Sequence, residues 1–283
     1  MDLKEQIGSK KFGHQYKMYA VKFQSKTSTK LTRSFHVLPL RKEFIMYQAL
    51  SGGVGIPRTY AFSENSEKEM LVMDMLGESL ERIFHRKCHG KFSVKTVLML
   101  AEQMLTRYQF IHERGFIHRD VKANNFVMGL PGSSEENTIF VVDFNLSKSW
   151  NRSLVEQSVS YIKGNRNNSG INVFESWTFE REKTLGRKHD LEGLGYLFLH
   201  FLGFCPWKSR SEMALYTRDL KAFRSKLYQH KVPTEFVEYL DHTRTLNKNQ
   251  DPNYDYLRGL FRNCAKKLNI TFPYDNRFDW YKK

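Results

Sequence analysis

Helical periodicity dominates the middle of the chain. Apolar side chains recur every three or four residues from Val94 to Ile111, and Ser93 stands before them as an N-cap. A second apolar run, Leu194 to Trp207, is interrupted by a histidine, two glycines and a proline. It is too short to span a bilayer, so we expect a buried helix there, which the stretch Gly186–Glu192 opens. From residue 78 onward the pattern predicts mostly helices and loops.

The first 76 residues follow another pattern, typical of short strands with one helix. The segment Leu40–Leu50 has helical spacing, whereas Leu71–Met73 is a short apolar run that predicts a strand. Between them, Gly52–Pro57 is rich in residues that form turns. Further along, Ile139–Val142 predicts another short buried strand. The chain therefore combines a strand-rich beginning with a longer helical remainder.

The composition is that of a globular protein, and the net charge is strongly basic. The 283 residues are 40% hydrophobic and 27% charged, and the formal net charge is +15. The length suits a single unit with two lobes better than two full domains. A basic protein attracts nucleic acid, anionic lipid or acidic protein. No dense block of Lys and Arg appears, so a merely solvated basic surface stays open as an alternative.

The cysteines and the first residues indicate where the protein resides. Cys88, Cys205 and Cys264 are few, widely spaced and odd in number, which favours a reducing compartment without a disulfide framework. Met1 leads directly into a charged stretch, so we expect no signal peptide.

One stretch carries recognisable chemistry. His118–Asn125 matches the pattern H-R-D-x-x-x-x-N, which resembles the catalytic loop of protein kinases. Phosphoryl transfer needs a carboxylate to accept the proton of the attacking hydroxyl, and Asp120 is suited to that. It also needs a cation near the phosphoryl group and an amide oxygen on a metal ion, which Lys122 and Asn125 supply.

A second motif follows in the expected order. The strand Ile139–Val142 delivers Asp143-Phe144-Asn145, in the place of the D-F-G motif whose aspartate holds magnesium. One motif alone could arise by chance, but two in sequence favour a kinase fold strongly. We therefore predict an α+β class and a bilobal protein kinase fold, with a small β-rich N-lobe and a larger, mostly helical C-lobe.

The phosphate-binding elements are less clear. Ile7–Gly13 occupies the place of a glycine-rich phosphate loop, with Lys10 at its middle glycine. Two lysines compete to grip the phosphates. Lys22 lies in a sequence like V-A-I-K, but it follows the loop too closely for two full antiparallel strands and their turn. We favour Lys30, which also lies 13 residues before Glu43, its expected ion-pair partner.

The chain resembles one kinase family closely, the casein kinase I serine/threonine kinases, and their alpha-like branch most of all. The resemblance runs from about residue 7 to residue 280. The stretches that carry it are Gly52–Pro57, Leu71–Gly77, Ser79–Glu81, Lys95–Ala101, Ile117–Asp120, Asn125–Gly129, Asp190–Glu192, Leu194–Tyr196, Tyr254–Arg258, Leu260–Asn263 and Phe278–Trp280.

The resemblance implies an activity, ligands and a set of site residues. It implies a single kinase domain over residues 1–283, with an N-lobe of about 1–76 and a C-lobe of about 77–283. It implies ATP and Mg²⁺ as cofactors and serine or threonine in acidic or phosphorylated proteins as substrate, in the cytoplasm or nucleus. Asp120 and Lys122 are then catalytic, and Asn125 and Asp143 bind the metal. The ATP-binding residues it implies are Ile7, Gly8, Gly13, Lys30, Glu43, Asp74, Leu76 and Val127.

Several positions depart from the family pattern. Lys10 and Asn145 replace glycines, and we expect asparagine at position 145 because it tolerates a positive φ best. Ala123-Asn124 stand where the family has Pro-Asp. In the activation segment, Ile171 replaces a threonine that bonds the catalytic Asp and Lys, and Val173 replaces an arginine that binds primed phosphate.

These departures leave two functions from different classes open. The first is an active kinase, slow or narrow in specificity, because every charged participant is present. The second is a catalytically inactive pseudokinase that acts as a binding or regulatory module, because the replacements cluster around the site. Nucleic-acid binding rests on net charge alone and ranks third, so we do not expect nucleic acid as a partner. We expect a monomer without a membrane span.

Overall fold

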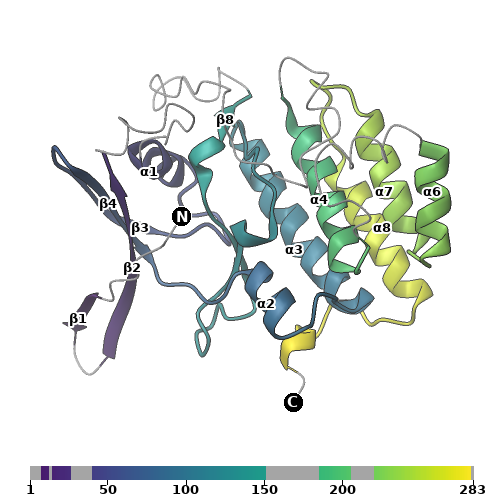
Figure 1. Ribbon diagram of the computed structural model, residues 1–283, viewed down its shortest axis with the longest axis horizontal. Coiled ribbons are helices and arrows are strands. Elements are labelled where there is room, and N and C mark those ends of the chain that lie inside the picture. Colours follow the sequence, from purple (N-terminus) through teal and green to yellow (C-terminus); the bar gives the residue numbers. More distant parts are fainter. Residues whose placement is uncertain (1–7, 13–14, 27–39, 151–184, 205–219, 282–283) are drawn as a thin grey trace.

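The computed structural model describes residues 8–12, 15–26, 40–150, 185–204 and 220–281 of the chain. Four strands and one helix form a strand-rich lobe at one end of the molecule, and the longer helices form a second lobe at the other end (Figure 1). The predicted α+β class, with a small strand-rich part and a larger helical part, is confirmed.

An antiparallel sheet with the strand order β1-β2-β4-β3 makes up most of the strand-rich lobe. Strand β1 pairs with the first part of β2, from Gln15 to Tyr19, whereas β4 pairs with the second part, from Tyr19 to Ser25. The β1–β2 hairpin therefore extends past the end of β4 (Figure 1). The strands are β1 Gly8–Phe12, β2 Gln15–Ser25, β3 Thr59–Glu64 and β4 Lys68–Asp74.

Helix α1, Leu40–Ala49, lies against one face of this sheet, as the helical spacing predicted. Phe44 of α1 stacks on Phe62 of β3 with ring centroids 5.3 Å apart. The backbone N–H of Leu40 donates to the buried carboxylate of Glu69 on β4 at 2.7 Å. Because a helix begins with unsatisfied N–H groups, this bond fixes the start of α1 to the sheet.

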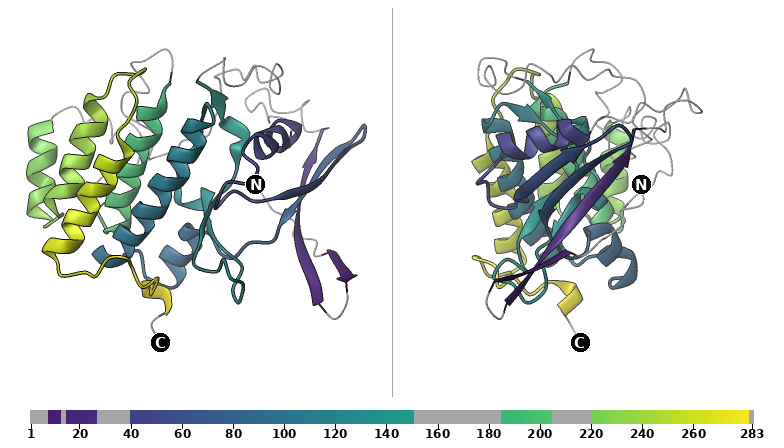
Figure 2. Two further views of the ribbon diagram at one scale, coloured as in Figure 1. Left: turned by 180° about the vertical axis from the view of Figure 1, so that it is seen from behind. Right: turned by 90° about the vertical axis from the view of Figure 1, so that its left-hand side faces the viewer.

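The helical lobe is built around α3, Val94–Glu113, which the periodicity predicted together with its cap. The Ser93 hydroxyl accepts a hydrogen bond from the Thr96 N–H at 3.2 Å. Helices α4 and α8 lie against α3, and α7 lies against both of them (Figure 2). The helices of this lobe are α2 Leu80–Arg86, α3, α4 Arg187–Phe201, α6 Leu220–Gln229, α7 Thr234–Thr245 and α8 Tyr254–Lys267, with a short helix at Asp279–Tyr281.

The buried helix expected around Leu194–Trp207, with Gly186–Glu192 as its opening, is α4. Helix α4 begins at Arg187, next to the N-cap Gly186, and ends at Phe201. Gly203 has a φ of 81°, a conformation that glycine adopts without strain and that ends a helix. The charged first turn of α4 is buried as well as the apolar run, with Arg187 at 7% and Asp190 at 2% exposure.

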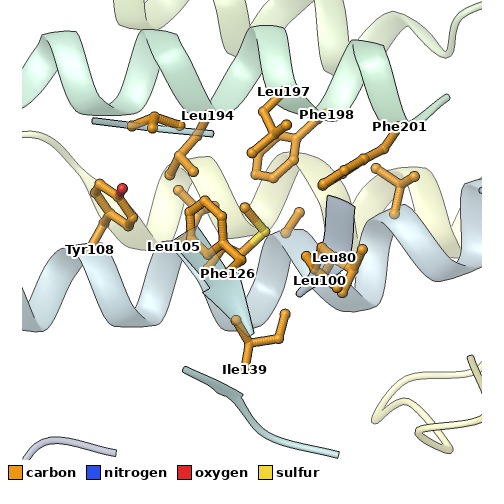
Figure 3. Close-up of a cluster of buried hydrophobic side chains, with 14 of the residues drawn as sticks. Leu80, Leu100, Leu105, Tyr108, Phe126, Ile139, Leu194, Leu197, Phe198 and Phe201 are labelled. Atoms are coloured by element: carbon orange, nitrogen blue, oxygen red, sulfur yellow. The ribbon is translucent and has the colours of Figure 1, made fainter. Parts of the chain in front are cut away.

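A buried apolar cluster joins α3 and α4 and supports the motifs between them. Leu194 and Phe198 of α4 point toward Leu105 and Tyr108 of α3, and Phe126 lies in the same cluster (Figure 3). All of these side chains are fully buried. Phe126 begins a short strand, so the core fixes the chain just after the H-R-D motif.

Two small ribbons bring the two motifs together. Strand β5, Phe116–Ile117, pairs with β8, Lys148–Ser149, and strand β6, Phe126–Met128, pairs with β7, Ile139–Val141. Short 3₁₀ turns at Ala123–Asn125 and Phe144–Leu146 complete the segments. Within the described residues, no helix has both the length and the apolar composition that crossing a membrane requires.

Candidate active site

A buried carboxylate holds the backbone of the H-R-D motif. The N–H groups of His118 and Arg119 each donate to Asp190, at the start of α4, across 2.8 Å. His112 of α3 lies 2.8 Å from the same carboxylate, through Nε2. Burial alone would raise the pKa of Asp190, but the hydrogen bonds that it accepts from His112 and from the Arg119 N–H lower it overall. Asp190 thus anchors the catalytic loop as an ionised acceptor.

The tautomer of His112 follows from its surroundings. Burial lowers the pKa of His112, so its ring is neutral and one nitrogen carries the proton. Nε2 faces the carboxylate of Asp190 and donates, which leaves Nδ1 to accept from the hydroxyl of Tyr254 on α8. Three helices, α3, α4 and α8, therefore meet at this one side chain.

The predicted catalytic residues lie together just after this anchor. Lys122 Nζ donates to Asp120 Oδ2 at 2.6 Å, and Asn125 Nδ2 donates to the same oxygen at 2.9 Å. Asn125 Nδ2 also bonds the Asp120 carbonyl at 2.9 Å. The structure therefore brings together Asp120, Lys122 and Asn125, as their spacing in the H-R-D motif predicted.

The ion pair with α1 involves a different lysine from the one favoured by sequence spacing. Lys22 Nζ lies 2.5 Å from Glu43 Oε2 and 3.8 Å from Asp143 Oδ1. Glu43 pairs with Lys22, so the prediction that its partner is Lys30 is wrong. Lys30 itself lies outside the described residues. The spacing argument required two strands between the glycine motif and the lysine. The structure has one, because β2 follows β1 after a two-residue connection and runs on to Ser25.

Lys22 and Asp143 stabilise each other's ionised forms. Burial lowers the pKa of Lys22, but the carboxylates of Glu43 and Asp143 raise it above the ordinary value, so the amine stays protonated. Burial would raise the pKa of Asp143, yet Lys22, Lys122 and the Asn145 amide lower it overall. Asp143 is therefore an ionised carboxylate, as a ligand of a metal ion must be.

Aromatic packing connects α1 to the catalytic loop through the Asp143 segment. The ring of Phe144 lies 5.1 Å from that of Tyr47 and 5.0 Å from that of His118. The Tyr47 hydroxyl accepts from the Asp143 N–H at 3.2 Å. Sequence reasoning missed Tyr47, although a tyrosine four residues after Glu43 lies on the same helix face, a signal that could have found it.

Asn145 does not have the backbone conformation that the sequence predicted. Among these residues the positive φ values belong to Arg119, at 71°, and Asp143, at 66°, whereas Asn145 lies in the 3₁₀ turn and has none. The expectation that asparagine is tolerated at 145 because of its φ is therefore wrong. Its side chain has a different role, since Nδ2 donates to Asp143 Oδ1 at 2.9 Å.

The hinge between the lobes lies at the end of β4. Tyr19 of β2 lies between Gly8 of β1 and Asp74 of β4, so these two predicted ATP-binding residues are level with each other in the sheet. The Asp74 carboxylate accepts from the Arg58 N–H at 2.9 Å and from the Tyr60 hydroxyl at 2.5 Å. Its side chain is thus occupied, and its N–H donates to the Arg58 carbonyl at 2.9 Å.

Beyond Asp74 the chain joins the helical lobe through backbone bonds. The Gly77 N–H donates to the Met128 carbonyl at 2.8 Å, and the Met128 N–H donates to the Glu78 carbonyl at 3.0 Å. Leu76 and Val127 are both half-buried beside this connection. The predicted residues of the hinge and of strand β6 are therefore neighbours.

Comparison with known proteins identifies the family. A model of the protein kinase domain matches residues 2–267. The chain belongs to the protein kinase family. It is 36% identical over 278 residues to casein kinase I homolog 3 and 38% identical over 248 residues to casein kinase I homolog 1, both of Schizosaccharomyces pombe. The resemblance to casein kinase I is thus confirmed.

The two alignments differ in how much of each protein they cover. They cover 92% and 85% of this chain, but 58% and 55% of the two relatives. The chain therefore spans somewhat more than half the length of these curated relatives.

The donor atoms of this kinase site fit ATP with Mg²⁺. Mg²⁺ prefers oxygen ligands and is commonly held by one or two carboxylates together with substrate phosphates. Asp143 offers a carboxylate, and Asn125 offers its amide oxygen because its nitrogen is used by Asp120. The Val142 N–H bonds the Asn125 carbonyl at 3.0 Å and brings both residues to the same end of the β6–β7 ribbon. Lys22 would hold phosphate oxygens, since kinases place a lysine paired with a glutamate there.

Some predicted kinase residues fall outside what the structure describes. Ile7, Gly13, Ile171 and Val173 lie in segments without a described placement, as does Lys30. The described residues that sequence reasoning overlooked share one property: each acts through a partner far away in the chain. They are Tyr47, His112 as a partner of Asp190, Asp190 as an anchor, and Lys42, whose Nζ donates to the backbone carbonyl of Asn145 at 2.7 Å.

Proposed function

We propose that the protein is a serine/threonine kinase of casein kinase I type that transfers the γ-phosphoryl group of ATP to protein side chains. The observation that carries this proposal is the position of Lys22 between Glu43 and Asp143. In protein kinases this ion pair and the metal-binding aspartate must both be in place for catalysis.

The neighbouring residues supply the rest of the chemistry. Bound Mg²⁺ would neutralise the charge that develops on the phosphates. Asp120 accepts the proton of the substrate hydroxyl, while Lys122 and Asn125 hold that carboxylate in place. Lys122 is also close enough to Asp143 to lower its pKa, which brings the proton acceptor and the metal ligand into one site.

A pseudokinase is the second candidate, and the replaced residues support it. Lys10, Ile171 and Val173 stand where the casein kinase I pattern has a glycine, a threonine and an arginine. The contributions of those three family residues to phosphate and substrate binding would be lost. The intact charged network favours the active enzyme instead. Glu43 is 1% exposed, and burying a charged carboxylate costs free energy unless a partner offsets the loss of water. Lys22 is that partner here.

The decisive experiment measures phosphoryl transfer. Purified protein is incubated with radiolabelled ATP, Mg²⁺ and casein, beside an Asp120→Asn variant that keeps the shape of the side chain. We expect incorporation by the wild type and a loss of at least a hundredfold in the variant, since general-base catalysis contributes about 10²–10⁴-fold. Equal incorporation by the two proteins would point to a contaminating kinase, and a folded wild type without incorporation would favour the pseudokinase.

Nucleotide binding is tested separately. ATP with Mg²⁺ should raise the melting temperature of the wild type, because a ligand that binds the folded state stabilises it. Asp143→Ala should abolish the Mg²⁺-dependent part of that shift. The same shift in both proteins would overturn the assignment of Asp143 as a metal ligand.

We further propose acidic or phosphorylated proteins as substrates, because the formal net charge of +15 attracts such partners. We propose that the protein is a monomer in the cytoplasm or nucleus. Sedimentation velocity would test the first point, and a fluorescent fusion of the protein in living cells the second. A dimer at low micromolar concentration, or a fluorescent signal on a membrane, would contradict these expectations.

A further inference from the structure

Helix α1 presents two consecutive charged residues to the metal-binding segment. Glu43 reaches it through Lys22, as described above. Lys42 reaches it directly, since its Nζ donates to the backbone carbonyl of Asn145 at 2.7 Å. Both Lys42 and Glu43 are buried, at 8% and 1% exposure, although lysine and glutamate are almost never buried unless paired.

Asn145 in turn holds the carboxylate that the metal needs. Its Nδ2 donates to Asp143 Oδ1 at 2.9 Å, the same oxygen that lies 3.8 Å from Lys22 Nζ. Within the described residues, Asn145 Oδ1 is buried and has no partner. Turning the amide over would place that oxygen against the carboxylate, so the observed orientation, with nitrogen toward Asp143, is the favourable one.

The backbone of Asp143 needs such support. Its φ of 66° lies in the left-handed region, which costs a non-glycine residue of order 1–3 kcal/mol and persists only where the surroundings enforce it. Three hydrogen bonds hold this conformation. Asn145 donates to the Asp143 carboxylate, Lys42 donates to the Asn145 carbonyl, and the Asp143 N–H donates to the Tyr47 hydroxyl. A glycine at position 145 would have no side chain to bond the carboxylate.

Lys42 holds this position at an energetic cost. Burial, with the positive charges of Arg119 and Lys148 nearby, lowers the pKa of Lys42 to about 8. Within the described part of the chain, its one recorded hydrogen bond is the bond to the Asn145 carbonyl. Burying a methionine at position 42 would cost less free energy than burying the lysine amine. The amine therefore positions the Asp143 segment rather than stabilising the fold.

We propose that Lys42 and Asn145 form a latch that fixes Asp143 for metal binding. Lys42 ties the backbone of the segment to α1, and Asn145 ties the carboxylate oxygen Oδ1 to that backbone. The second oxygen, Oδ2, carries no recorded hydrogen bond within the described residues and is left to face the metal. Lys42 and Asn145 are thus positioning residues for the reaction, and this role rests on the proposed function.

The test combines hydrogen exchange without nucleotide and Mg²⁺ titration with ATP. Lys42→Met keeps the length of the side chain and removes the amine, and Asn145→Leu keeps the approximate size and removes the amide. Arg41→Met is the matched control, because it removes a charge from the same helix at an exposed side chain that bonds Glu64. Exchange is followed at the amides of residues 143–147, with the amides of α3 as the internal reference.

The latch predicts a local effect and a metal effect together. In nucleotide-free Lys42→Met and Asn145→Leu, amides 143–147 should exchange about fivefold to tenfold faster, the equivalent of one net hydrogen bond. The Mg²⁺ concentration that half-saturates ATP binding should rise by a similar factor. Arg41→Met should match the wild type in both measurements, and the amides of α3 should not change in any variant.

Other results would overturn the proposal. If Lys42→Met exchanges at 143–147 at the wild-type rate, the latch does not exist, whatever the activity. If α3 exchanges faster to the same degree, the lysine supports the whole fold rather than this segment. If the wild type binds no ATP in the presence of Mg²⁺, the proposed function fails first, and the metal-positioning role fails with it.

Discussion

Lys22 donates to Glu43 across 2.5 Å, between β2 of the sheet and helix α1. The two residues lie 21 positions apart in the chain, and both are largely buried. The same amine lies 3.8 Å from Asp143, so one cation connects the sheet, the helix and the Asp143 segment. The position of α1 against the sheet is therefore coupled directly to the geometry of the site.

This relationship predicts which lysine grips the phosphates. Lys22→Met should weaken binding of ATP with Mg²⁺ by about ten- to a hundredfold, since a hydrogen bond to a charged group contributes about 1.5–3 kcal/mol. Lys30→Met should change binding less than threefold. Isothermal titration calorimetry on both variants measures the difference.

A third variant controls for the unpaired glutamate that Lys22→Met leaves behind. Lys22→Arg keeps a positive charge beside Glu43 and should preserve the fold while losing part of the affinity, because arginine and lysine differ in shape and donors. Stronger loss of binding in Lys30→Met than in Lys22→Met would restore the interpretation based on sequence spacing.

The error over Lys30 shows where sequence reasoning ends. The spacing from the glycine motif favours Lys30 only if two strands intervene. The local sequence Ala20-Val21-Lys22 favours Lys22 instead. The structure needs only one strand, β2, to reach Lys22. The pairing of Lys22 with Glu43 agrees with the local motif and not with the spacing.

Local motifs predicted which residues of the H-R-D segment lie together, but they did not reveal the partners that are distant in the chain. Asp120, Lys122 and Asn125 lie within six positions, and their short spacing determines their contacts. The anchor Asp190 lies 72 positions from His118, and its role depends on the packing of α4 against α3. Periodicity indicates that a helix is buried, but it does not say which backbone groups its first turn will meet.

The anchor itself can be tested. Asp190→Asn should lower the free energy of unfolding by about 2–3 kcal/mol, because the site loses a charged acceptor to which three groups donate, and hydrogen bonds to charged groups contribute about 1.5–3 kcal/mol. Those groups are the N–H groups of His118 and Arg119 and the ring of His112. Urea denaturation measures the change, and turnover should fall too, since a small displacement of the catalytic loop can cost about a hundredfold.

Asp241→Asn is the surface control for this prediction. Asp241 pairs with Arg224 between α7 and α6, where both side chains are partly exposed. Surface ion pairs contribute about 0–1 kcal/mol, so this variant should denature close to the wild type. Equal stability of the Asp190→Asn variant and the wild type would show that the carboxylate is not the anchor.

The buried amine of Lys42 predicts a specific pH dependence of stability. The pKa of Lys42 is lowered from 10.5 to about 8 in the folded protein. Between these values the unfolded chain holds a proton that the folded chain has lost, so the contribution of Lys42 to stability rises with pH. Relative to Lys42→Met, the wild type should gain about 2 kcal/mol between pH 7 and pH 9.5.

Urea denaturation of both proteins at the two pH values measures this gain. Arg41→Met should show no such change relative to the wild type, because an arginine keeps its charge throughout this range. A stability difference between wild type and Lys42→Met that stays constant from pH 7 to pH 9.5 would mean that Lys42 titrates normally.

The last prediction concerns Ile171, which lies outside the described residues and stands where the family has a threonine. In the structure Lys122 and Asn125 already bond Asp120, so the catalytic residues are assembled without that hydroxyl. Ile171→Thr should therefore add one hydrogen bond to an intact site. One such bond corresponds to about a tenfold increase in turnover.

Ile171→Val separates the hydroxyl from the change in size, because valine and threonine have nearly the same shape. We expect no gain in Ile171→Val, and no gain from Ile171→Thr in an Asp120→Asn background, since the hydroxyl acts through that carboxylate. Peptide phosphorylation at saturating ATP measures all of these variants. An equal gain with valine would show that the bulk of isoleucine, and not the missing hydroxyl, slows the enzyme.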